Sequence, residues 1–148
     1  MKIAIIGTGN LGLSIAKGLV INNTYTALYL TKRDLETLDP WKEYDQVYVT
    51  QDNKKAVAAS DILIFAVQPS QMEGILNEIK SHLNDKHILI STITGFSIAR
   101  IEAIAGASTP IIRSMPNTAI SVAKSMTCLC SNALGEKRIA IAEAILLY

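Results

Sequence analysis

MKIAIIGTGNLGLSIAKG, residues 1–18, is the stretch that decides the fold of this chain. Its apolar run Ile3–Ile6 is typical of a buried strand. The next residues, Gly7–Gly12, have the spacing G-x-G-x-x-G, and apolar residues then recur at helical spacing from Leu11 to Leu19. Glycines placed between a strand and a helix in this way are typical of a turn that binds the pyrophosphate of a dinucleotide. The alternative is that they only build a turn.

Each glycine of the motif has a separate physical task in such a turn. Gly7 makes the tight turn, Gly9 allows the backbone to approach a pyrophosphate, and Gly12 allows the helix to pack closely on the strand. The first turn of the helix then faces the phosphates, because its unpaired N–H groups and the positive end of its dipole attract an anion without a lysine. The motif therefore predicts a dinucleotide site near the start of the chain.

Length and composition argue against several classes of protein. With 148 residues the chain fits one domain, which can bury a core without disulfides. Hydrophobic residues make up 49%, but no apolar run has the length of a membrane span and no signal peptide precedes the glycine motif, so we expect a cytoplasmic protein. The net charge of +1 and the lack of a basic stripe with aromatic residues argue against nucleic acid as a partner.

The cysteines and histidines do not form a chemical centre in the sequence. Cys128 and Cys130 lie two apart on an expected strand, so they share one face, and we interpret them as small core residues rather than a redox pair. His82 and His87 have no cysteine or carboxylate cluster beside them. We therefore expect no metal site.

Five apolar runs predict the central strands of the fold. They are continuous rather than alternating, which is what a parallel sheet covered by helices on both faces requires. The sequence thus predicts an α/β fold of the Rossmann type, a doubly wound and mostly parallel sheet, as one dinucleotide-binding domain over residues 1–148. The central strands are expected near residues 2–6, 26–31, 61–67, 87–92 and 110–115, with further strands at 47–50 and 126–130 and a last helix at 135–147.

The residues after the second strand decide which dinucleotide is preferred. In this fold an acidic residue there binds the ribose 2′-hydroxyl of NAD and repels the 2′-phosphate of NADP. The chain instead has Thr31, Lys32 and Arg33, a hydroxyl and two cations that suit the phosphate. We therefore expect NADP(H) as the cofactor, with NAD(H) as the alternative. Without a ligand, the same residues are a solvated basic turn.

The carboxyl ends of the later strands should complete the site, because ligands of an open α/β sheet lie beyond those ends. On that edge we expect Ala66–Pro69, and also Thr94–Gly95, where the nicotinamide end of the cofactor would lie. Taken alone, the proline would only end a strand. The strand at 110–115 runs into Pro116–Thr118, which brings two polar side chains to the same edge.

Four stretches, in order along the chain, give a resemblance to a known family. They are Ile5–Gly12, Asn53 with Ser60–Leu63, Ala66–Pro69 and Arg113–Thr118. With these stretches the chain resembles the pyrroline-5-carboxylate reductases, NAD(P)H enzymes that reduce the cyclic imine pyrroline-5-carboxylate to proline. The glycine stretch is common to dinucleotide folds, whereas A-V-x-P followed later by R-x-M-P-N-T is close to a family signature.

The resemblance implies NADP(H) as the cofactor, with NAD(H) as the alternative, and it implies a role for each matching residue. The glycine turn would hold the pyrophosphate, the basic turn the 2′-phosphate, and the later strand ends the nicotinamide half. The implied cofactor contacts are Gly7, Thr8, Gly9, Asn10, Leu11, Gly12, Thr31, Lys32, Arg33, Asn53, Ala66, Val67, Gln68, Pro69, Thr94, Gly95 and Asn117. The family usually has lysine where this chain has Gln68, and loss of that cation changes the electrostatics beside the nicotinamide.

The family also implies a second part of the enzyme. Its members continue into a helical domain that carries the substrate site and forms a homodimer or higher homo-oligomer, and this chain lacks it. No residue near the expected site is a good general acid, so catalytic residues are left unassigned and we expect cofactor binding without turnover. Arg113 is expected in a structural ion pair. The alternatives are a non-catalytic module for a nicotinamide nucleotide, or a related reductase of another small substrate.

Overall fold

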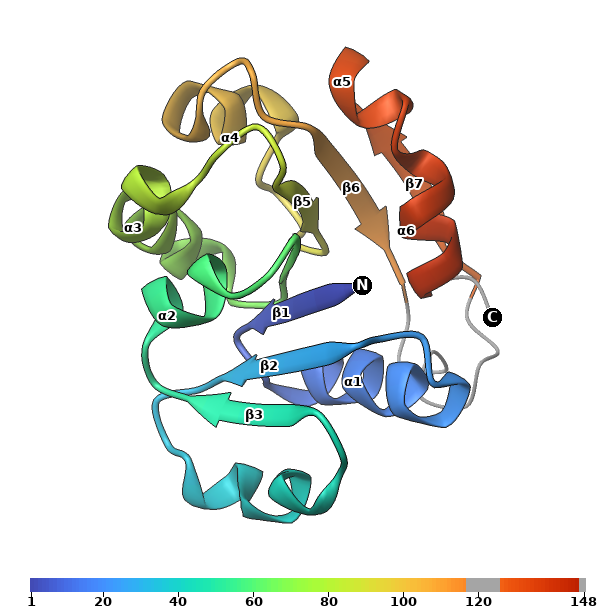
Figure 1. The fold of residues 1–148 in the computed structure, drawn as a ribbon. Coiled ribbons are helices and arrows are strands. Elements are labelled where there is room, and N and C mark those ends of the chain that lie inside the picture. The colour runs from blue at the N-terminus through green and yellow to red at the C-terminus, as the bar shows by residue number, and fades with distance from the viewer. Residues whose placement is uncertain (117–125, 147–148) are drawn as a thin grey trace.

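A single sheet forms the middle layer of the molecule. The computed structural model describes residues 1–116 and 126–146, and in this part of the chain seven strands pair in the order β3-β2-β1-β4-β5-β6-β7 (Figure 1). The strands are β1 (Lys2–Ile6), β2 (Ala27–Thr31), β3 (Val47–Thr50), β4 (Ile62–Phe65), β5 (Ile88–Ser91), β6 (Ile111–Met115) and β7 (Cys128–Ser131). The predicted α/β fold of the Rossmann type is confirmed.

Strands β1 to β6 are parallel, and β7 is antiparallel to β6. In the middle of the sheet Ile5 lies between Leu30 of β2 and Ile64 of β4, and all three side chains are fully buried. The strand order reverses at β1, since the chain builds β2 and β3 on one side of β1 and then returns to add β4 on the other. Such a reversal opens a crevice at the carboxyl ends of β1 and β4, where ligands of this fold bind.

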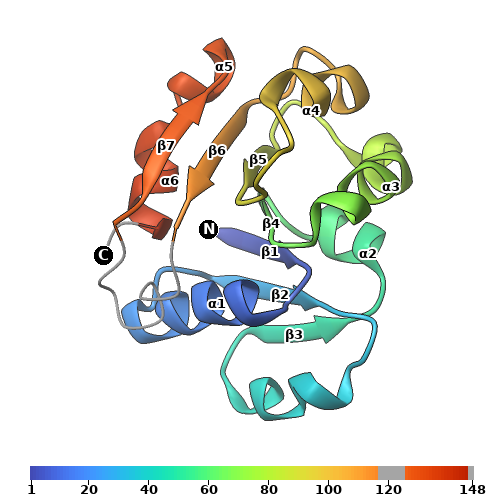
Figure 2. The ribbon, with the colours of Figure 1, turned by 180° about the vertical axis from the view of Figure 1, so that it is seen from behind.

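Helices cover both faces of the sheet. They are α1 (Asn10–Asn22), α2 (Asn53–Ala58), α3 (Pro69–Ile79), α4 (Ile98–Ala105), α5 (Ala133–Glu136) and α6 (Ile139–Leu146), with 3₁₀ helices η1 (Glu36–Glu43) and η2 (Lys80–His82). One core cluster packs Leu19 of α1 and Ile145 of α6 on the sheet, and the other packs Met72 of α3 and Ile101 of α4 on the opposite face. Figure 2 shows α2, α3 and α4 grouped together, away from α1.

The C-terminal part differs from the sequence-based expectation. The helix predicted over 135–147 is two short helices, α5 and α6, and residues 147–148 lie outside the described residues. α5 starts two residues before the predicted helix, under a side-chain cap from Asn132, and ends at Glu136 with Lys137 as its C-cap. The apolar residues at helical spacing, Ile139, Ala142, Ile145 and Leu146, all lie in α6, so periodicity does not locate the break before it.

The interpretation of the two cysteines as core residues is wrong. Cys128 and Cys130 do share one face of β7, but that face is exposed, while Leu129 on the other face packs against the core. The strand lies at the edge of the described sheet, and Leu129 packs against the core cluster that contains Ile145 and Leu146 of α6. The spacing of two gives a common face but does not say which face is covered.

Residues 1–116 and 126–146 contain neither a membrane-spanning helix nor a cluster of metal-binding side chains. No described helix has both the length and the apolar character needed to cross a lipid bilayer. Nor do three or more histidine, cysteine, aspartate or glutamate side chains gather in a group that could hold a metal ion.

Candidate functional site

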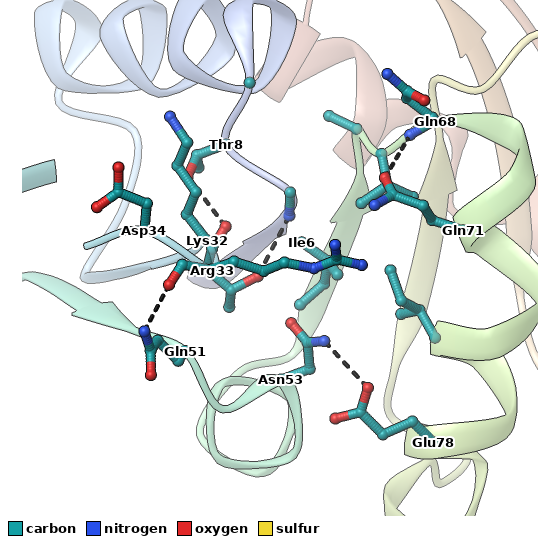
Figure 3. A pocket seen from close by; sticks show the side chains of 16 residues that line it. Ile6, Thr8, Lys32, Arg33, Asp34, Gln51, Asn53, Gln68, Gln71 and Glu78 are labelled. Atoms are coloured by element: carbon teal, nitrogen blue, oxygen red, sulfur yellow. Dashed lines mark hydrogen bonds between the residues drawn. The ribbon is translucent and has the colours of Figure 1, made fainter. Parts of the chain in front are cut away.

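A pocket of about 570 Å³ opens at the carboxyl ends of β1, β2 and β4, where the strand order reverses (Figure 3). Ten of the predicted site residues line it: Gly7, Thr8, Gly9, Thr31, Lys32, Arg33, Asn53, Ala66, Val67 and Gln68. Six others do not line it: Asn10, Leu11, Gly12, Pro69, Thr94 and Gly95. The remaining one, Asn117, lies outside the described residues.

The three glycines of the motif differ in what their missing side chains allow. A Cβ on Gly7, whose φ is +87°, would clash with Val67, and a Cβ on Gly12 would lie 2.5 Å from the Gly7 carbonyl oxygen. A Cβ on Gly9 would meet no atom within 4 Å. Gly7 and Gly12 are therefore required by the fold itself, as a turn and a close contact of helix with strand. Gly9 is not, and it leaves bare backbone on the pocket wall.

The first turn of α1 is open to a ligand. Its N-cap is Gly9, which offers no side chain to the N–H groups, and no acidic residue lies in the turn. By contrast α2, α4 and α5 begin with side-chain caps from Asp52, Ser97 and Asn132. N–H groups that no side chain caps, at the positive end of a helix dipole, favour an anion.

Thr31 joins β2 to the glycine turn. Its hydroxyl oxygen accepts from the Gly7 N–H at 3.2 Å, and its carbonyl oxygen accepts from both the N–H and the hydroxyl of Thr8 at 3.0 Å. Thr31 is only 2% exposed. The geometry gives this threonine a structural role in holding the turn, and a contact of its hydroxyl with a phosphate stays a prediction.

The basic turn after β2 lies at the mouth of the pocket. Lys32 is half-buried and Arg33 is exposed, and neither belongs to an ion pair among the described residues. Figure 3 shows the Arg33 side chain extending across the pocket toward α3. The Gln51 side-chain amide donates to the Arg33 carbonyl oxygen and so ties this turn to the loop after β3. Two cations with no fixed partner thus face the pocket.

Six lining residues were not among the predicted site residues: Ile6, Asp34, Gln51, Gln71, Ile75 and Glu78. Three of them come from α3, which begins directly after Gln68. Their spacing of four and three residues puts them on one helix face, so helical periodicity extended from Gln68 could have found them. Asp34 is a second acid on the wall, and its Oδ1 accepts from the Glu36 N–H at 3.1 Å.

Asn53 and Glu78 meet at the bottom of the pocket in the view of Figure 3. The Asn53 side-chain amide, at the start of α2, donates to Oε2 of Glu78 near the end of α3 at 3.3 Å. Both side chains line the pocket. The bond joins two helices that precede and follow β4, so the tertiary fold, not local sequence, makes this pair.

The other end of the predicted site lies beyond β5. Gly95 has a φ of +76° in the turn before α4, which strains any residue with a Cβ. Arg113 of β6 donates from Nη2 to the carbonyl oxygen of Ile93 at 3.3 Å. The ion pair expected for this arginine is not present among residues 1–116 and 126–146, where its buried Nε has no partner either. Arg113 therefore braces the loop after β5.

Comparison with known proteins agrees with this geometry. A family model described as "NADP oxidoreductase coenzyme F420-dependent" matches residues 2–95, which contain the glycine turn, the basic turn and β4. The chain belongs to this family. Within it, the chain corresponds to the N-terminal NAD(P)-binding domain of the pyrroline-5-carboxylate reductases, which confirms the resemblance found in the sequence.

Three similar proteins show the extent of this match. Pyrroline-5-carboxylate reductases 1 and 2 of Dictyostelium discoideum are 41% and 40% identical over 91% and 88% of this chain, which is 25% and 45% of their own length. The structure of a pyrroline-5-carboxylate reductase from Coxiella burnetii has a TM-score of 0.89 and 33% identity over 98% of this chain and 55% of that one. The chain thus spans between a quarter and about half of the length of these relatives.

Proposed function

We propose that this chain binds NADP(H) and supplies the cofactor half of a pyrroline-5-carboxylate reductase, which makes proline in amino-acid biosynthesis. The observation that carries the proposal is the first turn of α1, which no side chain caps and which faces the pocket across the bare backbone of Gly9. The relatives of the chain are named for that reaction, and the matching family is described as NADP oxidoreductases.

The residues of the pocket fit the cofactor. The pyrophosphate would lie against Gly7–Gly12, since the first-turn N–H groups need an acceptor and Gly9 leaves room for it. The 2′-phosphate would lie between Lys32 and Arg33, which have no acidic partner among the described residues. Asn53 would contact the adenosine side. NAD(H) would leave the two cations without a phosphate to bind.

The nicotinamide half would run along the later strand ends. The bound nicotinamide ring supplies the hydride for the reduction. Of the contacts proposed for this half, Ala66, Val67 and Gln68 line the pocket, and Pro69, Thr94, Gly95 and Asn117 would extend the site beyond it. Catalytic residues are not assigned. A helical domain beyond this chain would hold the cyclic imine and build the homo-oligomer of a cytoplasmic enzyme.

A non-catalytic module that binds a nicotinamide nucleotide is the second candidate. It is favoured by one observation: the acids that line the pocket, Asp34 and Glu78, lie near the basic turn and Asn53, and each already accepts a hydrogen bond. Neither lies at the strand ends where the imine would be reduced. Among the described residues that line the pocket, neither carboxyl group is thus placed to protonate a substrate nitrogen at the nicotinamide end, while the glycine and basic turns suit phosphates.

Two measurements separate these functions. Fluorescence titration should give a lower dissociation constant for NADPH than for NADH, and a preference for NADH would contradict the cofactor assignment. NADPH oxidation with pyrroline-5-carboxylate should be absent for this chain and present for a version extended through its reading frame. If the extended protein binds NADPH but shows no turnover with any cyclic imine, the non-catalytic module is the better description.

A further inference from the structure

The acid Glu78 is unexpected in a pocket suited to a polyanion. It lines the pocket together with Arg33, Asn53 and Ile75. The ion pairs formed by the described residues, Lys42–Asp39 and Arg100–Glu73, do not include it. A carboxylate that faces an anionic ligand without a cation to neutralise it weakens binding, unless it accepts a hydrogen bond from that ligand.

Few groups of a nicotinamide dinucleotide can donate such a bond at this end of the pocket. The ribose 2′-hydroxyl is replaced by phosphate in NADP(H), and the basic turn that would bind this phosphate borders the same pocket. The adenine ring carries an exocyclic amine, which is a donor with two hydrogens. Glu78 uses Oε2 for the Asn53 amide, and its other oxygen is in no hydrogen bond with the described residues. That oxygen is free to accept from the amine.

The walls around Glu78 match a flat ring. Figure 3 shows Arg33 reaching from β2 toward α3, above Asn53 and Glu78. Ile75 lies one turn before Glu78 on α3 and also lines the pocket, so an apolar side chain and a planar guanidinium both border the same space. Guanidinium groups stack on aromatic rings. A purine between them would have its edge directed at the Asn53–Glu78 pair.

We propose that Glu78, held by Asn53, reads the exocyclic amine of adenine and makes this pocket specific for adenine dinucleotides. The inference rests on the proposed function and adds the base specificity of the same site. Hypoxanthine has a carbonyl oxygen where adenine has the amine, so a carboxylate at this position repels it. Asn53 positions the carboxylate by occupying Oε2 at 3.3 Å, which directs the remaining oxygen to the ligand.

The test compares NADPH with its hypoxanthine analogue, using fluorescence titration of the whole chain. The dissociation constant should be at least about tenfold lower for NADPH, because the analogue loses a bond to a charged acceptor. In Glu78→Gln the carboxamide can donate to the carbonyl oxygen, so the ratio should fall below about threefold. Melting temperatures measured alongside should be unchanged, since Glu78 belongs to no ion pair in the described residues.

Glu73→Gln is the matched control. Glu73 is an exposed acid on the same helix, outside the pocket and paired with Arg100 at 3.4 Å, so its loss should leave the base ratio at the wild-type value. A wild-type ratio in Glu78→Gln, with NADPH still bound, overturns the inference and leaves the proposed function intact. A change in the ratio of NADPH to NADH instead assigns Glu78 to the ribose and also overturns it. If the wild-type chain binds none of these nucleotides, both the inference about Glu78 and the proposed function are overturned.

Discussion

At two places in this molecule a turn leads from a strand into a helix that contains a glycine packed closely against a carbonyl oxygen. Gly12 lies in the first turn of α1, which follows β1, and a Cβ on it would lie 2.5 Å from the Gly7 oxygen. Gly135 lies in α5, which follows β7, and a Cβ on it would overlap the Ile111 oxygen. The turns differ in their caps. Asn132 binds the N–H of Gly135 at 2.7 Å, whereas Gly9 offers α1 no side chain. Close packing is thus common to both turns, and only the uncapped one can hold an anion.

The largest expected effect is on stability, and it comes from the close contact of a glycine with a carbonyl oxygen that each turn has. Gly12→Ala and Gly135→Ala should each lower the free energy of unfolding by about 3 kcal/mol, because backbone has to move to admit the methyl group. Urea denaturation measures this. Gly74→Ala in α3 is the control, since a Cβ there meets nothing within 4 Å and alanine favours a helix, so stability should rise slightly. Equal losses in all three variants would contradict the packing argument.

The next effect concerns the capped turn alone. The Asn132 side chain accepts from the N–H groups of Ile111 and Gly135 and donates to Glu102 and the Thr109 carbonyl oxygen, at 2.7–3.1 Å. Asn132→Ala should cost about 2 kcal/mol of stability without changing NADPH affinity, because it breaks all four bonds far from the pocket. Chemical denaturation and titration of the same sample check both parts. A cost no larger than that of Ser97→Ala, which removes one cap, would show that the extra bonds contribute little.

A cap introduced into the open turn should convert it into a copy of the second turn. The backbone of Gly9 is extended, with φ −77°, so Gly9→Asn can bind the first-turn N–H groups without strain. NADPH affinity should then fall about a hundredfold, since two charge-assisted bonds to phosphate are lost, while stability stays level or rises by a few tenths of a kcal/mol. Gly9→Ala is the control, because alanine adds the bulk of a Cβ without a group that can cap the helix. Undiminished affinity in Gly9→Asn would place the pyrophosphate elsewhere.

The smallest expected effect is on NADPH affinity when one cation of the basic turn, which lies near the glycine turn only, is removed. Lys32→Gln should weaken NADPH binding by about tenfold and leave NADH unaffected, because one cation beside the 2′-phosphate is lost and solvent screens part of its contribution. The difference should shrink as salt is added. Titrations at low and high ionic strength check it, with Lys42→Gln as the control, a lysine outside this pocket that is already paired with Asp39. Equal losses for NADPH and NADH would remove Lys32 from the phosphate site.

Much of the fold could be predicted because the signals are local. Continuous apolar runs such as Ile62–Phe65 mark strands buried on both faces, and Asp52 and Ser97 cap helices within three residues of themselves. The same holds for Gly12, where a Cβ would meet the Gly7 carbonyl group and the Ile5 side chain of the same strand–turn–helix unit. The roles of these residues follow from short spacings that the chain itself sets.

The amino-acid sequence by itself determined the parallel sheet, the glycine turn and the basic turn after β2, since periodicity and spacing along one segment are enough for each. Only the tertiary structure decided which side chains meet across segments. It buried Thr31 as a brace, exposed Cys128 and Cys130, and gave Arg113 a loop carbonyl instead of a carboxylate. It also joined Asn53 to Glu78 across twenty-five residues. These outcomes depend on how the sheet and the helices pack. The free energy of packing comes from burying surfaces that segments far apart in the sequence contribute, so no single segment predicts it.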